Sequence, residues 1–552
     1  MAKQKLRVIP LGGLGEIGKN MLALEFDNDI IVIDAGLMFP KEDQYGVDLV
    51  IPDISYLTER REKVRGIIIT HGHEDHTGAL PYVLRELKVP VYATKLTLGL
   101  ISVKLKEHRL KTEARLKEVT PGEIITLGKF KVEFFSVCHS IPDAAGLIIR
   151  TPVGVVVHSG DFKLDHTPVN GHPSELARLA QVALQEPLLL LSDSTYAELP
   201  GYTPSERLVG ETFDRIFADA AGRIMVTTFS SLISRVQQVL DAAARHGRYV
   251  VVVGRSMTEN VRISRELGYL TDSGNVLRNL DQIKGLPHNK IALVTTGSQG
   301  EPTSALVRIS NRDHKQLHII PGDTVVMSAT PVPGNEALVN RTIDNLFRQG
   351  ARVLWDRVAM VHVHGHGSQE ELKLLINLIR PKYFVPIHGE YRHMSLHAGL
   401  ARSLGIPDSN IFVLEDGDVL ELTEKSGKVA EKVSAGPVYV NGLSVGDIGS
   451  VILRDRKLLA QDGIVIAIVA MDKRDGSLVG RPDIVSRGFV DEKESPELLE
   501  QSRDLLAQAL SRGGPHVAEW AYVSGKVKDT LSRFFYEQTK RRPMILPVLI
   551  EV

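Results

Sequence analysis

The chain has 552 residues, of which 43% are apolar and 24% are charged, and its net charge is −1. This length exceeds what one hydrophobic core supports, so we expect two to four domains. No apolar run approaches the ~20 residues that a membrane helix needs, which excludes a membrane-spanning protein and argues against a membrane partner. Because the net charge is near zero, a nucleic acid would have to be held by a local basic surface.

The single cysteine, Cys138, excludes an intramolecular disulfide and fits a reducing compartment. The first residues carry charge without a long apolar region, so no signal peptide is predicted. We therefore expect a cytoplasmic protein.

Residues 6–164 are mostly short β-like runs, which predict a mixed α/β domain built from hairpins. Near its start, Gly13, Gly15 and Gly18 form the G-x-G-x-x-G pattern of a dinucleotide-binding turn, with Asp34 as the acidic partner. A crossover helix needs a dozen or more residues, and only residues 19–29 separate Gly18 from the next strand-like run. The glycines therefore predict a tight loop between hairpin strands, and NAD binding is not expected.

The pattern changes after about residue 205, where apolar strand-like runs alternate with helical stretches until about 360. Such alternation predicts a parallel sheet with both faces covered. Further on, a strand-like run at 383–390 precedes a Gly- and Lys-rich stretch, and the last part of the chain predicts two helices at 497–511 and 515–536 between strands. We expect a first domain over 1–204 that resumes over 361–423, an insertion over 205–360, a linker over 424–459 and a small αβ domain over 460–552.

The segment ITHGHEDHTGAL (69–80) contains four ligand-type side chains within six residues: His71, His73, Asp75 and His76. Imidazole and carboxylate are common protein ligands of divalent ions such as zinc. In a turn after a strand, the first two histidines can serve one ion while Asp75 and His76 serve a second. A solvated polar turn is the alternative, and it does not explain this spacing.

Two further segments supply residues for the same site. His139 follows a strand-like run in SVCHSIPD, and Asp161 follows another in VVVHSGDF. Each residue alone would be weak evidence, because a single histidine more often serves a structural hydrogen bond. Together with the first cluster, both are predicted to be metal ligands.

Taken in order, IDAG, HGHEDHTG, CHS and HSGD resemble the metallo-β-lactamase superfamily. The resemblance implies an αββα sandwich with one or two metals at the sheet edge, where Asp161 bridges two ions and the last ligand is a distant histidine. The next histidine of this kind is His388 in PIHGEYRH, and the predicted α/β layer lies between the two. Such an insertion is similar to the β-CASP subgroup, whose members cut nucleic acids. The implied fold is thus an α/β metallo-β-lactamase sandwich with an inserted Rossmann-like β-CASP domain and a small C-terminal αβ domain.

The β-CASP motifs can be matched singly: LSDSTYAE places Asp193 in the first, HVHGHGSQEE places His366 in the second, and PIHGEYRH places His388 in the third. A histidine in the third position is typical of the RNA-cutting branch, whereas the DNA-repair branch has valine. TTFSSLISRVQQ, GSQGEP and RPDIVSRGFV extend the resemblance to the bacterial ribonuclease J family along nearly the whole chain. The sequence departs from that family at 231–234 and 364–367, which affects the details of RNA contact and leaves the metal site intact.

The resemblance implies a metal-dependent ribonuclease with 5′→3′ exonuclease activity that prefers a 5′-monophosphate end, together with endonuclease activity, in mRNA decay and rRNA maturation. His71, His73, His139 and Asp161 would hold one ion, and Asp75, His76, Asp161 and His388 the other. The two divalent ions are expected to be Zn²⁺, with Mn²⁺ or Mg²⁺ also compatible. His366 is the candidate general acid and Asp193 would fix its tautomer. The predicted catalytic residues are Asp75, His76, Asp193 and His366.

A 5′-monophosphate pocket needs hydroxyl and amide donors on small residues near a helix start. The residues expected to form it are Ser230, Ser231, His364, Gly365, His366 and Ser368. The expected partners are single-stranded RNA and a second copy of the chain, in a homodimer or higher homo-oligomer supported by the tail domain, with other RNA-decay proteins as further candidates.

Three other functions compete with this hypothesis. A small-molecule metallohydrolase predicts a short path from Asp161 to the last ligand, which the long insertion contradicts. A β-CASP DNA nuclease predicts valine in place of His388. A non-enzymatic RNA-binding subunit predicts lost ligands, and none is missing from the sequence.

Overall fold

The computed structural model describes residues 4–41, 43–110, 114–170, 172–332, 334–442, 444–474, 476–511 and 520–552. Contacts divide the chain into two units. The first comprises Met1–Phe39 and Val50–Val438, and the second comprises Pro40–Leu49 and Tyr439–Val552.

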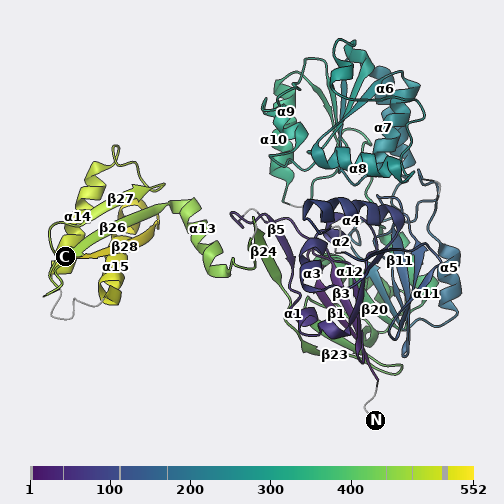
Figure 1. The fold of residues 1–552 in the computed structure, drawn as a ribbon, viewed down its shortest axis with the longest axis horizontal. Helices are drawn as coiled ribbons and strands as arrows, with labels where there is room; N and C mark the ends of the chain where they lie inside the picture. The colour runs from purple at the N-terminus through teal and green to yellow at the C-terminus, as the bar shows by residue number, and fades with distance from the viewer. Residues whose placement is uncertain are drawn as a thin grey trace. The chain divides into compact units, whose positions relative to one another are not determined.

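Hairpin-linked strands build two mixed sheets in the first unit (Figure 1). The larger sheet has the order β23-β22-β1-β3-β4-β6-β7-β8, with β1 Leu6–Gly12, β3 Met21–Phe26, β4 Asp29–Ile33, β6 Val64–Ile68, β7 Val91–Ala93, β8 Leu116–Glu118, β22 Asp418–Leu422 and β23 Gly427–Lys432. The smaller sheet has the order β20-β13-β12-β11-β10-β9, with β9 Ile124–Leu127, β10 Phe130–Ser136, β11 Ala145–Thr151, β12 Gly154–His158, β13 Leu189–Asp193 and β20 Tyr383–Ile387.

One apolar core lies between these two sheets. Leu24 and Phe26 of the larger sheet and Phe134 and Leu147 of the smaller sheet are fully buried in it. The other side of each sheet is covered by helices. On the smaller sheet, Phe384 and Ile148 pack in a second core with two helices, α5 (Leu176–Ala183) and α11 (Gln369–Ile379).

On the outer side of the larger sheet, Tyr56 of α1 (Ser55–Thr58) donates a hydrogen bond to Glu25 of β3. The remaining helices of this part are α2 Glu74–Thr77, α3 Leu80–Glu86, α4 Lys95–Glu107 and α12 Tyr391–Ser403. Helix, sheet, sheet and helix therefore form the αββα sandwich that the sequence predicted, and the fold class is confirmed.

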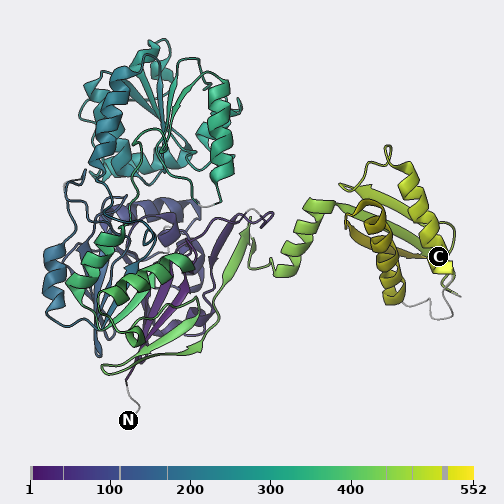
Figure 2. The same ribbon diagram turned by 180° about the vertical axis from the view of Figure 1, so that it is seen from behind.

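The insertion is a fully parallel sheet of order β16-β15-β17-β14-β18-β19 (Figure 2). Its strands are β14 Ile224–Thr227, β15 Tyr249–Val253, β16 Leu277–Arg278, β17 Ile291–Thr295, β18 Thr324–Met327 and β19 Arg352–Leu354. Adjacent residues of β14 enter opposite cores: Val226 packs with the helices of one face, and Met225 with those of the other. The first face carries α6 Arg207–Asp219, α7 Ile233–Arg245 and α8 Arg255–Glu266, and the second carries α9 Ala305–Ser310 and α10 Glu336–Arg348.

The glycine-rich loop forms a hairpin connection, as predicted. Gly13 and Gly18 have φ of 92° and 111°, a region that side chains other than glycine rarely adopt. Between them, β2 (Leu14–Gly15) pairs in parallel with β21 (Gly389–Glu390), directly after His388. The loop therefore lies against the segment that carries the last predicted ligand.

The stretch expected to be a linker, 424–459, contains regular structure. β23 pairs antiparallel with β22, with Lys428 opposite Glu421 and Val429 opposite Leu420, and so extends the larger sheet. β24 (Pro437–Asn441), β25 (Ser444–Val445) and most of α13 (Ser450–Asp462) follow. The high content of Gly and Lys had suggested a linker and carried no pattern that predicts these strands and this helix.

After α13, the described residues of the second unit form a three-stranded sheet of order β27-β26-β28 and two further helices. Its elements are β26 Ile464–Met471, β27 Asp483–Arg487, β28 Met544–Glu551, α14 Pro496–Ser511 and α15 Trp520–Thr539. Val465 and Val469 of β26 pack against Leu506 and Val527 of the helices. The predicted helix start at 515–519 lies outside the described residues.

Across all described residues, no helix is both long and apolar enough to cross a membrane.

Candidate metal centre and active site

The predicted ligands come from segments that follow the strands of both sheets. His71 and His73 lie in the loop after β6, and His76 lies in the short helix α2 that continues it. His139 and Asp161 follow β10 and β12 of the smaller sheet. Strand ends from two sheets thus converge on one site, as loops at the edge of a rigid scaffold commonly do.

Close backbone packing fixes the metal loop. A Cβ atom on Gly36 would lie 1.6 Å from the carbonyl oxygen of Asp75, so only glycine fits there. Asp34 accepts hydrogen bonds from the Thr70 backbone nitrogen at 2.8 Å and from His76 Nδ1 at 2.8 Å. Asp34 and His388 both adopt left-handed backbone, with φ of 63° and 53°, and such strain is frequent at functional sites.

The first ligand group consists of three histidines. His71 Nε2 and His139 Nε2 lie 3.0 and 3.1 Å from His73 Nδ1. Burial lowers the pKa of His71 and of His139 well below the usual value and lowers the pKa of His73 to about 4. Three neutral imidazoles with nitrogen atoms facing one another are suited to hold a divalent ion.

The second ligand group consists of Asp75, His76, Asp161 and His388. His76 Nε2 lies 3.2 Å from Asp161 Oδ2 and 3.5 Å from Asp75 Oδ2, and His388 Nε2 lies 3.5 and 3.3 Å from the same two oxygens. Ligand atoms of a tetrahedral zinc ion, bound at about 2.0–2.1 Å, are separated by about 3.3 Å. The four side chains therefore already stand at the spacing that such an ion requires.

Charge is balanced within this second group. Burial opposes charge on His76 and His388, but the neighbouring carboxylates raise the pKa of both rings well above the usual value. Burial likewise opposes charge on Asp161 and Asp75, but the same histidines lower the pKa of both carboxyl groups. A bound cation would replace the protons on these histidines, because metal ligation requires the neutral ring.

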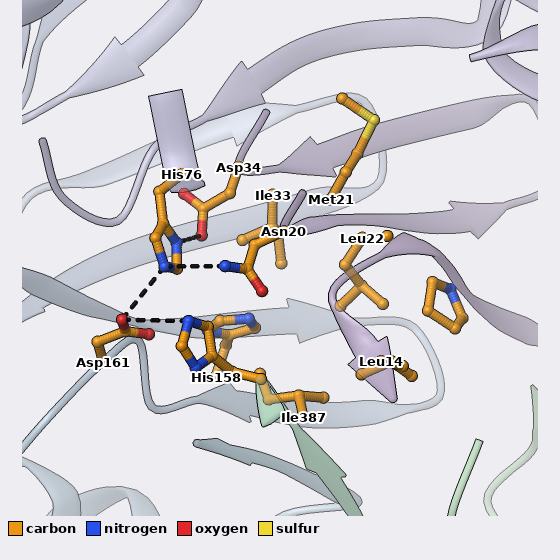
Figure 3. A pocket seen from close by; sticks show the side chains of 13 residues that line it. Leu14, Asn20, Met21, Leu22, Ile33, Asp34, His76, His158, Asp161 and Ile387 are labelled. Atoms are coloured by element: carbon orange, nitrogen blue, oxygen red, sulfur yellow. Dashed lines mark hydrogen bonds and ion pairs between the residues drawn. The ribbon is translucent and has the colours of Figure 1, made fainter. Parts of the chain in front are cut away.

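The rings of His76 and His139 are each oriented through their second nitrogen. Figure 3 shows the His76 ring with Asp34 at one nitrogen and Asp161 at the other. His139 Nδ1 donates to the carbonyl oxygen of Gly365 at 2.8 Å, and a Cβ atom on Gly365 would lie 2.6 Å from the His139 ring. Such outer hydrogen bonds fix the tautomer that presents a lone pair to a metal.

His366 and Asp193 form a hydrogen-bonded pair beside the metal ligands. His366 Nδ1 lies 2.7 Å from Asp193 Oδ2, and the His366 ring centre lies 4.9 Å from that of His139 and 5.4 Å from that of His388. Burial opposes charge on Asp193, but His366 and its hydrogen bond lower the pKa of this carboxyl group. Asp161, Asp193, His366 and His388 are also close enough to share an ion, but the short bond makes Asp193 the partner of His366.

The residues expected to bind a 5′-phosphate are divided between two places. Ser368 caps α11 in a capping box with Glu371, and its hydroxyl bonds to Thr203 Oγ1 at 3.0 Å. His364 stacks on Tyr196 with ring centres 3.8 Å apart. Ser230 and Ser231 are half-buried after β14, and no hydrogen bond among the described residues joins them to the 364–368 segment.

Three residues of the site were not foreseen from the sequence. Asn20 donates to Asp75 O and contacts His76 Nε2 at 3.2 Å, and Thr195 contacts His388. Glu371 accepts hydrogen bonds from the backbone nitrogens of Leu164, Thr203 and Ser368. Only Thr195 carried a sequence signal, because it lies two residues after Asp193 in the same motif. The contacts of Asn20 and Glu371 depend on segments far apart in the chain.

The fold and these ligand groups define a metallo-hydrolase of the metallo-β-lactamase superfamily. Family models match in agreement: "Metallo-beta-lactamase superfamily" over 14–220, "Ribonuclease J, beta-CASP domain" over 221–346, "Zn-dependent metallo-hydrolase RNA specificity domain" over 352–413 and "Ribonuclease J C-terminal domain" over 451–552.

Relatives match along the whole chain. The chain is 44% identical to ribonuclease J2 of Bacillus subtilis over 551 residues, covering 100% of this chain and 99% of that protein. It is also 44% identical to ribonuclease J of Thermus thermophilus over 553 residues, covering 99% and 95% of the two chains. The chain belongs to the ribonuclease J family, which confirms the resemblance inferred from its motifs.

A solved structure of a protein of unknown function from Enterococcus faecalis shares the fold. It superposes with a TM-score of 0.54 at 17% identity, covering 76% of this chain and 100% of that one. At this identity the likeness shows the fold alone.

Proposed function

We propose that this protein hydrolyses the phosphodiester bonds of single-stranded RNA with the help of two divalent ions. The observation that carries this proposal is the arrangement of two adjacent ligand groups around Asp161, with the His366–Asp193 pair beside them. Membership of the ribonuclease J family and the match to an RNA specificity domain over 352–413 support RNA as the substrate.

The donor set fits the ions. His71, His73 and His139 would hold one, Asp75, His76 and His388 the other, and Asp161 would reach both, since its Oδ2 lies 3.7 Å from His71 Nε2 and 3.2 Å from His76 Nε2. Two ions bound here would activate water and neutralise the phosphoryl oxygens. Imidazole and carboxylate donors favour Zn²⁺, with Mn²⁺ or Mg²⁺ as the alternatives.

His366 is the general acid in this scheme. Its Nδ1 atom donates to Asp193, so Nε2 is the nitrogen that can give a proton to the departing 3′-oxygen. The buried carboxylate of Asp193 orients the ring and fixes the tautomer with its proton on Nδ1. The products would carry a 5′-phosphate and a 3′-hydroxyl.

We further propose 5′→3′ exonuclease action with a preference for 5′-monophosphate ends, together with endonuclease action. Half-buried Ser230 and Ser231 precede α7, and His364, Gly365 and Ser368 lie within two residues of the general acid in the sequence, so they are the candidate 5′-phosphate ligands. RNA with a 5′-monophosphate should decay faster than the same RNA with a 5′-triphosphate, and equal rates would contradict the preference. Cleavage of a circular RNA, which has no end, would report the endonuclease separately.

A homodimer or higher homo-oligomer is the proposed assembly, with the second unit as the contact. The face of its sheet turned away from the helices is apolar: Ile466 pairs with Leu546 and Ile468 with Val548, and Leu546 and Ile550 are each 46% exposed. A contiguous exposed apolar patch commonly marks an interaction site. The proposed location is the cytoplasm, where the buried thiol of Cys138 would stay reduced.

One assay tests the central proposal. Labelled single-stranded RNA and DNA are incubated with the protein, with and without a chelator, and with His76→Ala and an exposed-histidine control, His288→Ala. RNA cleavage should require metal, disappear in H76A and persist in H288A. Cleavage that survives in H76A would defeat the two-metal scheme, and preferential cleavage of DNA would favour a DNA nuclease.

A further inference from the structure

Thr195 stands between the last metal ligand and the general-acid pair. Its Oγ1 atom lies 2.5 Å from His388 Nδ1 and 2.8 Å from Asp193 Oδ1, and the side chain is almost wholly buried. We propose that Thr195 is a positioning residue whose hydroxyl orients His388 toward the metal pair and links this ligand to the His366–Asp193 acid. The inference rests on the proposed function, which makes His388 a metal ligand and His366 the general acid.

The direction of each hydrogen bond follows from the donors available. The Asp193 carboxylate only accepts, so the single hydroxyl proton of Thr195 is donated to it. His388 Nδ1 must then donate to Thr195 Oγ1, which leaves the lone pair on Nε2. That nitrogen faces Asp75 Oδ2 and Asp161 Oδ2 at 3.3 and 3.5 Å, where the second ion would bind.

Asp193 extends the link to the acid. Its Oδ1 atom accepts from the Thr195 backbone nitrogen at 3.0 Å as well as from the hydroxyl, and its Oδ2 atom accepts from His366 Nδ1 at 2.7 Å. The order is therefore His388, Thr195, Asp193, His366, with each residue hydrogen-bonded to the next. A change at the Thr195 hydroxyl should disturb both ends of this chain.

The backbone around His388 needs such support. His388 has a left-handed φ of 53°, and its carbonyl oxygen contacts the Ser194 nitrogen at 3.3 Å and Thr195 Oγ1 at 3.2 Å. The Asp193 contact of the hydroxyl is shorter than this carbonyl contact, so the carboxylate is its main acceptor. The turn after β13 thus holds both the ring and the backbone of the ligand.

Ser194 offers a matched comparison on the same turn. Its Oγ atom lies 3.0 Å from His397 Nδ1, so it too bonds to a histidine of the 388–397 segment. Ser194 and His397 are fully buried, but His397 belongs to none of the three ligand groups found among the described residues. Removing this hydroxyl costs a buried hydrogen bond of the same kind without touching a ligand.

The experiment compares Thr195→Val, Thr195→Ser and Ser194→Ala. T195V keeps the shape and removes the hydroxyl, whereas T195S restores it. The readouts are bound zinc per chain after equilibration with a buffered chelator, the rate of zinc loss, the thermal midpoint, and kcat and KM on RNA. Loss of such an outer hydrogen bond should weaken retention of one of the two ions by about 10- to 100-fold in T195V, with kcat falling and KM little changed.

T195S should return zinc retention to near the native level, and S194A should lower the thermal midpoint while keeping both ions. Native zinc retention in T195V, equal loss in S194A, or failure of T195S to rescue would each overturn the positioning role. If T195V does not fold, Thr195→Ala replaces it with the same expectation. Because zinc retention needs no RNA, a protein whose zinc retention depends on the Thr195 hydroxyl but which cleaves no RNA would refute the proposed function and leave this inference standing.

Discussion

The two units of this chain depart from the usual distribution of polar and apolar residues in opposite directions. In the first unit, polar side chains are buried: His71 is 0% exposed, and Asp161 and Asp193 are 3% and 1% exposed. In the second unit, apolar side chains are exposed, with Leu546 and Ile550 at 46% each. A buried polar group or an exposed apolar patch is the informative observation in a folded protein.

The difference indicates where each kind of function lies. Buried charges persist only where they are paired or coordinate a metal, so the first unit carries the chemistry. A contiguous exposed apolar patch commonly marks an interaction site, so the proposed homo-oligomer contact is placed on the second unit. Variants of the first unit should change cleavage and leave the oligomer intact, and variants of the second should do the reverse.

The largest effect is expected at Asp161, the carboxylate between the two ligand groups. Asp161→Asn removes the charge that faces both groups, so zinc content should fall from two ions per chain and RNA cleavage should fall by at least about 10³-fold. The oligomeric state should not change. Metal analysis, a cleavage assay and light scattering check this, with exposed Asp241→Asn as the control. Near-native zinc content in D161N would contradict the assignment of Asp161 as a ligand of both ions.

The next effect separates the acid from the metals. His366→Ala should lower kcat by about 10²- to 10⁴-fold, because it removes a general acid, while both ions stay bound. A substrate with sulfur in place of the bridging 3′-oxygen needs no proton on its leaving group. H366A should therefore cleave this substrate nearly as well as the native protein does. A loss of equal size on both substrates would show that His366 is not the acid.

A third variant addresses the second unit. Ile466→Glu places a charge in the apolar sheet face and should weaken the proposed homodimer by at least about 10²-fold, because a charge cannot be buried there without a partner. Cleavage per chain and zinc content should stay native. Leu505→Glu adds the same charge on α14 as the control. An unchanged mass for I466E in light scattering would refute the assignment of this face.

The smallest effect is a pH dependence that comes from the buried histidines of the first unit. Burial lowers the pKa of His397 from its ordinary value of 6.5 to about 3. A folded-state pKa below the unfolded one means that the unfolded state binds the proton first, so stability is complete above about pH 6.5 and falls as pH decreases. At pH 5 this single group should cost about 2 kcal/mol.

Urea unfolding of the metal-free protein at pH 7 and pH 5 measures that loss. His397→Gln, which has no proton to gain, should lose about 2 kcal/mol less between these two pH values. An equal loss in both proteins would show that His397 is not buried as a neutral ring.

Much of this arrangement could be predicted from the sequence, because the ligands are local. His71 to His76 lie within six residues, and His139, Asp161 and His388 each follow an apolar run whose end marks a sheet edge. The alternation of strand-like and helical stretches over about 205–360 likewise predicted the inserted parallel sheet. The fold class and the family were therefore within reach of pattern and motif.

Other features depend on contacts that no local pattern carries. The sequence has a helical pattern over about 95–115, but α4 ends at Glu107 and the chain then supplies β8 to the larger sheet. The stretch that forms β23 was expected to be a linker because it is rich in Gly and Lys, yet sheet pairing with β22 decides its structure. The roles of Asn20 and Thr195 appear only when the loops of distant strands meet around the ligands.

The most direct test is the dependence of RNA cleavage on metal stoichiometry. The protein is freed of metal, zinc or manganese is added back in steps, and bound ions per chain and the rate of RNA cleavage are measured at each step. The account predicts negligible cleavage without metal and full cleavage only as the second ion per chain is bound. Full cleavage in the metal-free protein, or at one bound ion per chain, would contradict it.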